Sequence, residues 1–170
     1  TNPRVVEMNT SCPNEGTTSL LCYDIERMYE ITSRVKEVLG STPLVVKIGY
    51  FPDETLLRHF VERIGPVVDG IAAINTMGAR VVTAGGQQAF PGAGRAFAGV
   101  CGSPIKWAGL DMVKRLKWLR EAMGVSYTII GIGGVTKPVD YHHYRAAGAD
   151  AVLAATGVIW NPYLAQEIKG

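Results

Sequence analysis

Strand-like apolar runs alternate with helix-like segments along the whole chain, and this alternation constrains the fold. The runs span residues 4–9, 44–48, 70–74, 128–132 and 149–155. Apolar residues at helical spacing, with capping residues such as Asp53 and Thr136, predict helices at 24–39, 53–64, 107–123, 136–147 and 162–168. Strands that alternate with helices form a parallel sheet joined by right-handed crossovers. We therefore expect an α/β fold, with a long glycine-rich segment, 78–103, outside the regular pattern.

Polar residues and glycines follow the ends of successive expected strands, at Asn9, Lys47, Asn75, Gly133 and Thr156. A site at the carboxyl ends of strands is typical of a (β/α)₈ TIM barrel, and also of an open doubly wound sheet. A whole barrel needs about 250 residues, whereas this chain has 170. We therefore expect a single domain, 1–170, that carries the last five β/α units of a (β/α)₈ TIM barrel whose N-terminal strands are absent from this sequence.

The charge and cysteine content argue against several classes of protein. The formal net charge is +2 and no run of five like charges occurs, so no nucleic-acid partner is expected. The apolar stretches are too short and too broken to span a bilayer, and no signal peptide is visible, so no membrane association is expected. Three cysteines without CxxC spacing favour neither a disulfide framework nor a zinc site, and they indicate a reducing, cytoplasmic location.

The turn after the first expected strand, NTSCPN at residues 9–14, places a thiol between two carboxamides. Asn side chains offer both donors and acceptors, which suits a flat heterocycle that carries amide groups. Cys12 can act as a base near neutral pH where its surroundings help the thiolate. A buried structural cysteine in an Asx turn is an equally good interpretation of the residues alone. Cys22 and Cys101 lack such neighbours and are interpreted as structural.

Lys47 lies within an otherwise apolar strand. A buried Lys is rare without a partner, so the position favours a functional side chain over one that ends in water. It could serve as a Schiff-base nucleophile or as a fixed positive charge beside an electron-rich cofactor. Asn75-Thr76 closes the next strand with a polar pair, which fits a binding site and a simple turn equally well.

Two turns rich in small residues follow the last two expected strands. The first, 131–136, reads GIGGVT and opens a helix, and the second is Ala155-Thr156-Gly157. Glycines expose backbone N–H groups and a helix N-terminus adds positive potential, so the pair predicts a phosphate site. The pattern is not a dinucleotide fingerprint, because the third glycine of GxGxxG is missing.

A set of motifs with a consistent order and spacing extends over essentially all of the chain. They are NxSCPN at 9–14, Val46-Lys47, Asn75-Thr76, FAGVCG at 97–102 before Ile105-Lys106, Gly131-x-Gly133-Gly134, and Gly148-Ala149-Asp150 leading to Thr156. This set resembles the dihydroorotate dehydrogenase family. The resemblance implies an FMN-dependent (β/α)₈ barrel that oxidises dihydroorotate to orotate in pyrimidine synthesis. Cys12 resembles the class 1, soluble branch, since the quinone-linked, membrane-associated branch has Ser there.

The resemblance also implies a role for each matching residue. Cys12 would be the catalytic base, which takes a proton from substrate C5 while a hydride leaves C6 for flavin N5. The substrate-binding residues would be Asn9, Asn14, Asn75 and Thr76. The cofactor-binding residues would be Lys47 at the pyrimidine edge of the flavin, Ile74 and Gly102 along it, and Gly133, Gly134, Ala155 and Thr156 at its phosphate.

The sequence departs from the family pattern in two respects. The family's usual Gly-Gly-x-Ser-Gly run reads AGVCG at 98–102, so that only Gly99 and Gly102 match. The family's earlier strands, which supply further flavin contacts and a substrate-binding lysine, are absent. Dihydropyrimidine dehydrogenase shares the barrel and the Cys but usually has His where Asn14 stands, which favours dihydroorotate.

Two further interpretations come from other classes of protein. One is a phosphate-binding barrel lyase in which Lys47 forms a Schiff base. The other is a non-catalytic half-barrel that associates with a partner. Five strands cut from a barrel leave two unpaired edges, so we expect either a homo-oligomer or a companion segment that completes the barrel.

Overall fold

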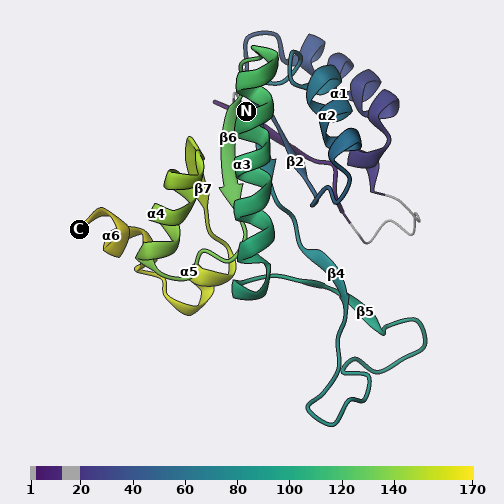
Figure 1. Cartoon of the computed structure of the whole chain (residues 1–170), viewed down its shortest axis with the longest axis vertical. Helices are drawn as coiled ribbons and strands as arrows, with labels where there is room; N and C mark the ends of the chain where they lie inside the picture. Colours follow the sequence, from purple (N-terminus) through teal and green to yellow (C-terminus); the bar gives the residue numbers. More distant parts are fainter. Residues whose placement is uncertain (1–2, 13–19) are drawn as a thin grey trace.

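The computed structural model describes residues 3–12 and 20–170, and its centre is a five-stranded parallel sheet (Figure 1). The strands are β1 (Val6–Asn9), β2 (Leu44–Ile48), β3 (Gly70–Ala73), β6 (Thr128–Ile132) and β7 (Ala151–Leu153). They lie in the order β1-β2-β3-β6-β7, and every neighbouring pair is parallel. The α/β class and the parallel sheet are therefore confirmed. β1 and β7 form the two edges of the sheet.

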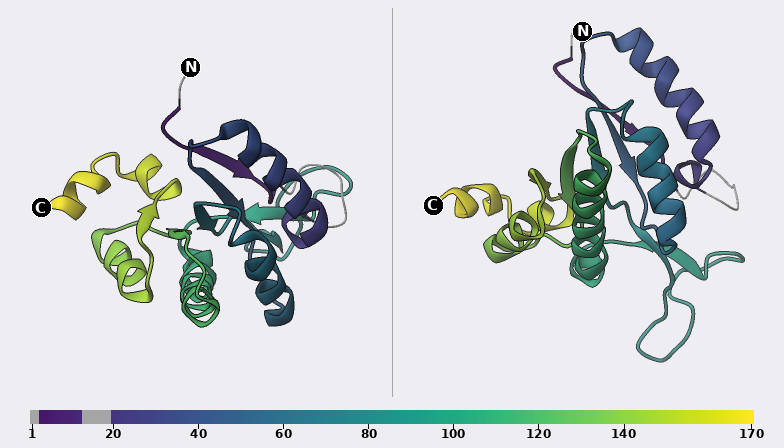
Figure 2. Two further views of the ribbon diagram at one scale, coloured as in Figure 1. Left: turned by 90° about the horizontal axis from the view of Figure 1, so that it is seen from above. Right: turned by 45° about the horizontal axis from the view of Figure 1, so that its top comes forward.

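Helices cover one face of this sheet (Figure 2). They are α1 (Ile25–Leu39), α2 (Glu54–Ile64), α3 (Lys106–Met123) and α4 (Pro138–Ala147). Side chains alternate between the two faces of a strand, and in β2 this alternation separates Val46, fully buried in the core, from its neighbour Lys47, which is only partly buried. The face away from the helices therefore carries the polar side chains of the sheet.

Local signals account for the starts of α1 and α2. The Asp24 carboxylate accepts from the N–H of Arg27 at the start of α1. Asp53 accepts from the N–H groups of Thr55 and Leu56 at 2.7 and 3.1 Å, which confirms it as the cap of α2. Both helices begin where the sequence predicts, because an N-cap depends only on residues that are close in the chain.

The glycine-rich segment contains more structure than expected. It forms an antiparallel pair, β4 (Met77–Arg80) with β5 (Phe97–Val100), which projects away from the sheet in Figure 1. A 3₁₀ turn, η2 (Ser103–Ile105), then leads into α3. These two strands were not predicted, because four-residue strands that contain glycine show no clear alternation.

The C-terminal part differs from expectation in two ways. The run 149–155 forms only the three-residue strand β7, and it is followed by α5 (Thr156–Trp160) before the expected last helix, α6 (Leu164–Lys169). A further 3₁₀ turn, η1 (Leu21–Tyr23), precedes α1. Among the residues that the structure describes, no helix is both long and apolar enough to cross a membrane.

Candidate functional site

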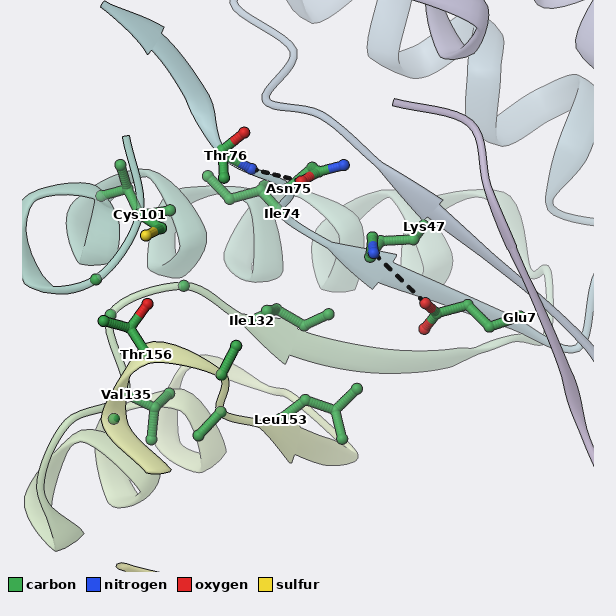
Figure 3. Close-up of a pocket in the computed structure, with 17 residues that line it drawn as sticks. Glu7, Lys47, Ile74, Asn75, Thr76, Cys101, Ile132, Val135, Leu153 and Thr156 are labelled. Atoms are coloured by element: carbon green, nitrogen blue, oxygen red, sulfur yellow. Dashed lines mark hydrogen bonds and ion pairs between the residues drawn. The ribbon is translucent and has the colours of Figure 1, made fainter. Parts of the chain in front are cut away.

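A cavity of about 300 Å³ lies at the carboxyl ends of the parallel strands (Figure 3). Figure 3 shows Lys47 and Glu7 at one end, Cys101 and Thr156 at the other, and apolar side chains between them. The predicted site residues that line it are Lys47, Ile74, Asn75, Thr76, Gly102, Gly133, Gly134, Ala155 and Thr156. Residues far apart in the sequence thus meet in one elongated cavity with a cation at one end.

Lys47 and Glu7 form the charged end. In the parallel register Asn9 lies opposite Lys47, and Glu7 lies two residues earlier on the same face of β1. The Lys47 Nζ is 3.6 Å from the Glu7 Oε1, and the two side chains keep 24% and 37% of their surface exposed. Lys47 therefore presents its ammonium group to the cavity beside a carboxylate, and does not end in bulk water.

Asn75 connects the ends of β3 and β1. Its Nδ2 donates to the Ser11 carbonyl oxygen at 2.9 Å, to the Ser11 hydroxyl at 3.0 Å and to the Asn9 Oδ1 at 3.2 Å. The Asn75 Oδ1 accepts from the N–H of Thr76 at 2.8 Å. The hydrogen bonds fix the orientation of the Asn75 amide and bring Asn9, which does not itself line the cavity, to the edge of the site.

Cys12 follows Ser11 directly and is half-buried, without lining the cavity. Ser11 is 1% exposed, and its hydroxyl lies within hydrogen-bond distance of the Asn9 side chain and of the Lys47 carbonyl oxygen. These contacts anchor the chain immediately before Cys12. Asn14, the other carboxamide of this turn, lies outside the described residues.

Gly133 and Gly134 form a tight turn after β6, with φ of +121° and +70°. A Cβ at Gly134 would lie 2.7 Å from the Lys106 Cβ and 2.8 Å from the Gly102 carbonyl oxygen, so only glycine fits this close approach. Gly133, Gly134 and Val135 are buried, yet their N–H groups have no hydrogen-bond acceptor within the described part of the chain. Buried N–H groups without a partner are rare. A phosphate bound at this turn would supply the missing acceptors.

The start of α4 differs from the predicted helix-terminus site. The helix begins at Pro138 with Lys137 at the N-cap position, so the prediction that Thr136 is the cap was wrong. The N–H groups of Thr136 and Lys137 both donate to the buried Asp140 carboxylate. They are therefore not free for an anion, and the N–H groups of the glycine turn remain as donors. The second expected turn is the start of α5, where Thr156 approaches Gly102 from the opposite wall.

Several lining residues were not among the predicted site residues, namely Glu7, Cys101, Ile105, Ile132, Val135, Leu153, Ala154 and Gly157. Glu7 could have been found because it lies two residues before Asn9 and so shares its face of the strand. Cys101 was interpreted as structural, but it is exposed and borders the cavity, whereas Cys22 is fully buried as expected. Burial raises the pKa of the Cys22 thiol to about 11, which keeps it protonated. The described residues hold no cluster of metal-binding side chains.

Comparison with known proteins gives a consistent result. The whole chain, residues 1–170, matches the family model of dihydroorotate dehydrogenase. A dihydroorotate dehydrogenase of Dictyostelium discoideum is 34% identical over 168 residues, which cover 96% of this chain and 45% of that protein. The catalytic subunit of a dihydroorotate dehydrogenase B (NAD(+)) of Exiguobacterium sibiricum is 32% identical, covering 97% of this chain and 51% of that protein.

The fold has a similar counterpart among solved structures. A crystal structure of DHODH from Eimeria tenella in complex with ferulenol gives a TM-score of 0.77 at 20% identity, over 98% of this chain and 48% of that chain. Identity at this level shows the shared fold alone. The chain spans about half the length of the curated relatives it matches.

Proposed function

Because the chain belongs to the dihydroorotate dehydrogenase family, we propose that the protein of which it forms part oxidises dihydroorotate to orotate, with FMN as its cofactor. The family fold is a TIM barrel, and this chain forms part of one. The observation that carries the proposal is the cavity, because it brings Lys47 and the glycine turns together at the carboxyl ends of the strands. Enzymes with this fold bind their ligands at that end of the barrel.

The residues of the cavity suit a flavin mononucleotide in shape and charge. The unpartnered N–H groups of the turn at Gly133 and Gly134 would bind the phosphate, with Ala155 and Thr156 on the opposite wall. Ile74 would contact the ring along the apolar middle of the cavity, and Gly102, which lies against Gly134 and Thr156, would contact the flavin nearer its phosphate. Lys47 would lie at the pyrimidine edge, where its positive charge favours a ring that gains negative charge on reduction. Bound flavin would supply the acceptor for the hydride that leaves the substrate.

The substrate would bind beside Asn75 and Thr76, with Asn9 and Asn14 from the turn after β1. Asn75 is fixed by Ser11, so its amide is oriented before a substrate arrives. Cys12 would act as the base, its Sγ taking the proton from C5 of dihydroorotate. A Cys base favours the class 1 branch, and with it a cytoplasmic location and a role in pyrimidine biosynthesis.

The domain organisation is part of the same proposal. β1 and β7 are the edges of the sheet, and Leu153 on β7 is 46% exposed on the open face. We infer that residues 1–170 form one domain and supply the last five β/α units, and that a companion segment pairs with both edges and supplies the substrate-binding lysine. A homo-oligomer is the alternative way of covering the open face. In the complete protein, we expect hydrogen exchange of the β1 and β7 amides to be as slow as that of β2.

An absorbance spectrum of the complete protein, purified from its native source, tests the function most directly. We expect flavin bands in the visible blue, and their bleaching when dihydroorotate is added under anaerobic conditions. Bleaching by a dihydropyrimidine, and not by dihydroorotate, would favour the dihydropyrimidine dehydrogenase alternative. A colourless protein in which borohydride traps a carbonyl substrate on Lys47 would favour the lyase. A protein with neither property would favour the non-catalytic half-barrel.

A further inference from the structure

Asp140 is a buried carboxylate beneath the turn that joins β6 to α4, and its side chain has 1% of its surface exposed. Its Oδ2 accepts from the N–H groups of Thr136 and Lys137 at 2.9 and 3.1 Å, and from the Thr136 hydroxyl at 3.1 Å. Its Oδ1 accepts from the Lys106 Nζ at 2.8 Å. A single carboxylate therefore connects the start of α4 to the start of α3.

Lys106 is the first residue of α3, and it lies directly against the glycine turn. The position that a Cβ would take at Gly134 lies 2.7 Å from the Lys106 Cβ and 3.0 Å from its Cα. The hydroxyl of Ser103, in the 3₁₀ turn before α3, lies 3.4 Å from the Thr136 hydroxyl. The start of α3 thus forms one wall of the turn, and the Asp140–Lys106 ion pair fixes its distance from the opposite wall, α4.

Tyr144 supports the same turn from one helical turn further along α4. Its hydroxyl donates to the Gly133 carbonyl oxygen at 2.6 Å, and the side chain is fully buried. Burial raises the pKa of this phenol, so it remains protonated and able to donate at neutral pH. The carbonyl of Gly133 is therefore fixed by Tyr144, and the N–H of Thr136 is fixed by Asp140. The unpartnered N–H groups belong to Gly133, Gly134 and Val135, which lie next to these two fixed points in the chain.

We propose that Asp140 is a positioning residue for the phosphate of the bound flavin. It fixes the glycine turn so that the free N–H groups of Gly133, Gly134 and Val135 converge on one anion, without contacting that anion itself. Asp140 is not among the residues that line the cavity, whereas all three of these residues are. The inference rests on the proposed function, because it takes the ligand of the cavity to be FMN.

The sign of the effect distinguishes positioning from simple electrostatics. A carboxylate near a phosphate repels it, so removing the charge of Asp140 would strengthen phosphate binding if charge alone mattered. In Asp140→Asn, an NH₂ group replaces one of the two carboxylate oxygens, and this group cannot accept a hydrogen bond. The one remaining oxygen cannot accept from both Lys106 and Thr136, so one of the two contacts is lost. The turn then loses a fixed point, and we expect FMN to bind more weakly although a negative charge has been removed.

The test compares FMN with riboflavin, which lacks the phosphate, on the complete protein stripped of its flavin. Dissociation constants are measured by the quenching of flavin fluorescence. We expect Asp140→Asn to weaken FMN about 10–100-fold, the range for lost hydrogen bonds to a charged group, and to leave riboflavin within about threefold. Tyr144→Phe removes one hydroxyl from the same turn, and we expect it to shift FMN in the same direction by a smaller factor.

Asp150→Asn is the matched control. The Asp150 Oδ2 accepts from the N–H of Ile129 at 2.8 Å and from the Arg120 guanidinium at 2.6 Å, at the amino ends of β6 and β7, away from the cavity. We expect it to change neither dissociation constant. Equal weakening of both flavins by Asp140→Asn, or tighter FMN binding, would overturn the positioning role. A wild-type protein that binds neither flavin would instead overturn the proposed function, and the inference with it.

Discussion

The side-chain amide of Asn75 donates to both the carbonyl oxygen and the hydroxyl of Ser11, at 2.9 and 3.0 Å, across the carboxyl ends of β3 and β1. The two residues are 64 positions apart in the sequence. Ser11 directly precedes Cys12, so Asn75 helps to place the proposed base as well as the proposed substrate. In the proposed mechanism, one amide group would therefore couple substrate binding to the chemistry.

Asn75→Ala tests this coupling. The Ser11 carbonyl oxygen would lose the Asn75 amide as its donor, and an unpaired polar group of this kind costs about 1–3 kcal/mol. We expect kcat/KM for dihydroorotate to fall about 10–100-fold, while the dissociation constant of FMN stays near its wild-type value. Asn161→Ala is the control. The side-chain amide of Asn161 also donates a hydrogen bond, but its acceptor is Glu167 and it lies at the end of α5. A parallel loss of FMN affinity in Asn75→Ala would contradict a role confined to the substrate.

Gly134→Ala tests the crowding at the proposed phosphate site. The added methyl group would meet the Lys106 Cβ at 2.7 Å and the Gly102 carbonyl oxygen at 2.8 Å. Gly124→Ala is a matched control, since its φ of +64° is close to the +70° of Gly134 but nothing lies within 4 Å of the added Cβ. Both variants carry a left-handed strain of about 1–2 kcal/mol. We expect only Gly134→Ala to weaken FMN, measured by fluorescence quenching, and equal affinities would argue against a phosphate at this turn.

The structure of the site was predictable where the signal is local. Lys47 was recognisable because a charged residue interrupts an apolar strand, and Asp53 because a cap acts on the next three residues. Glu7 was not predicted, although its alternation with Asn9 places the two side chains on one face of the strand. The role of Asp140 depends on Lys106, 34 residues away, which no local pattern reveals. Thr136 was wrongly predicted as a cap because its hydroxyl and its N–H are both taken by Asp140.

Cys12→Ala tests the proposed base. Removing the thiol leaves no group at this position to take the proton from C5, and general bases contribute about 10²–10⁴-fold to rate. We expect reduction of the bound flavin by dihydroorotate, followed by stopped-flow absorbance, to slow by that factor while the flavin content is unchanged. Cys12→Ser is expected to keep a weak activity that rises with pH, because a hydroxyl is a poorer base. Cys101→Ala removes a thiol that borders the same cavity, and it should leave the rate of flavin reduction near that of the wild type.

Acid should weaken the contacts that Asp140 makes. Burial by itself raises the pKa of this carboxyl, but the hydrogen bonds from Lys106 and Thr136 outweigh it, so the pKa lies below its ordinary value. The folded state then binds fewer protons than the unfolded state, whose Asp pKa is about 3.9, and stability rises with pH across this interval. We expect Asp140→Asn to lower the free energy of unfolding of the complete protein by about 1–3 kcal/mol at pH 7. That deficit should be full above about pH 5 and should shrink as the pH falls through the folded-state pKa.

The measurement is thermal unfolding followed by near-UV dichroism, with Tyr144→Phe as the control. The Tyr144 phenol does not titrate in acid, so the loss of stability in Tyr144→Phe should not change with pH. A deficit for Asp140→Asn that is the same at pH 3 as at pH 7 would show that the carboxylate is not stabilised by these contacts.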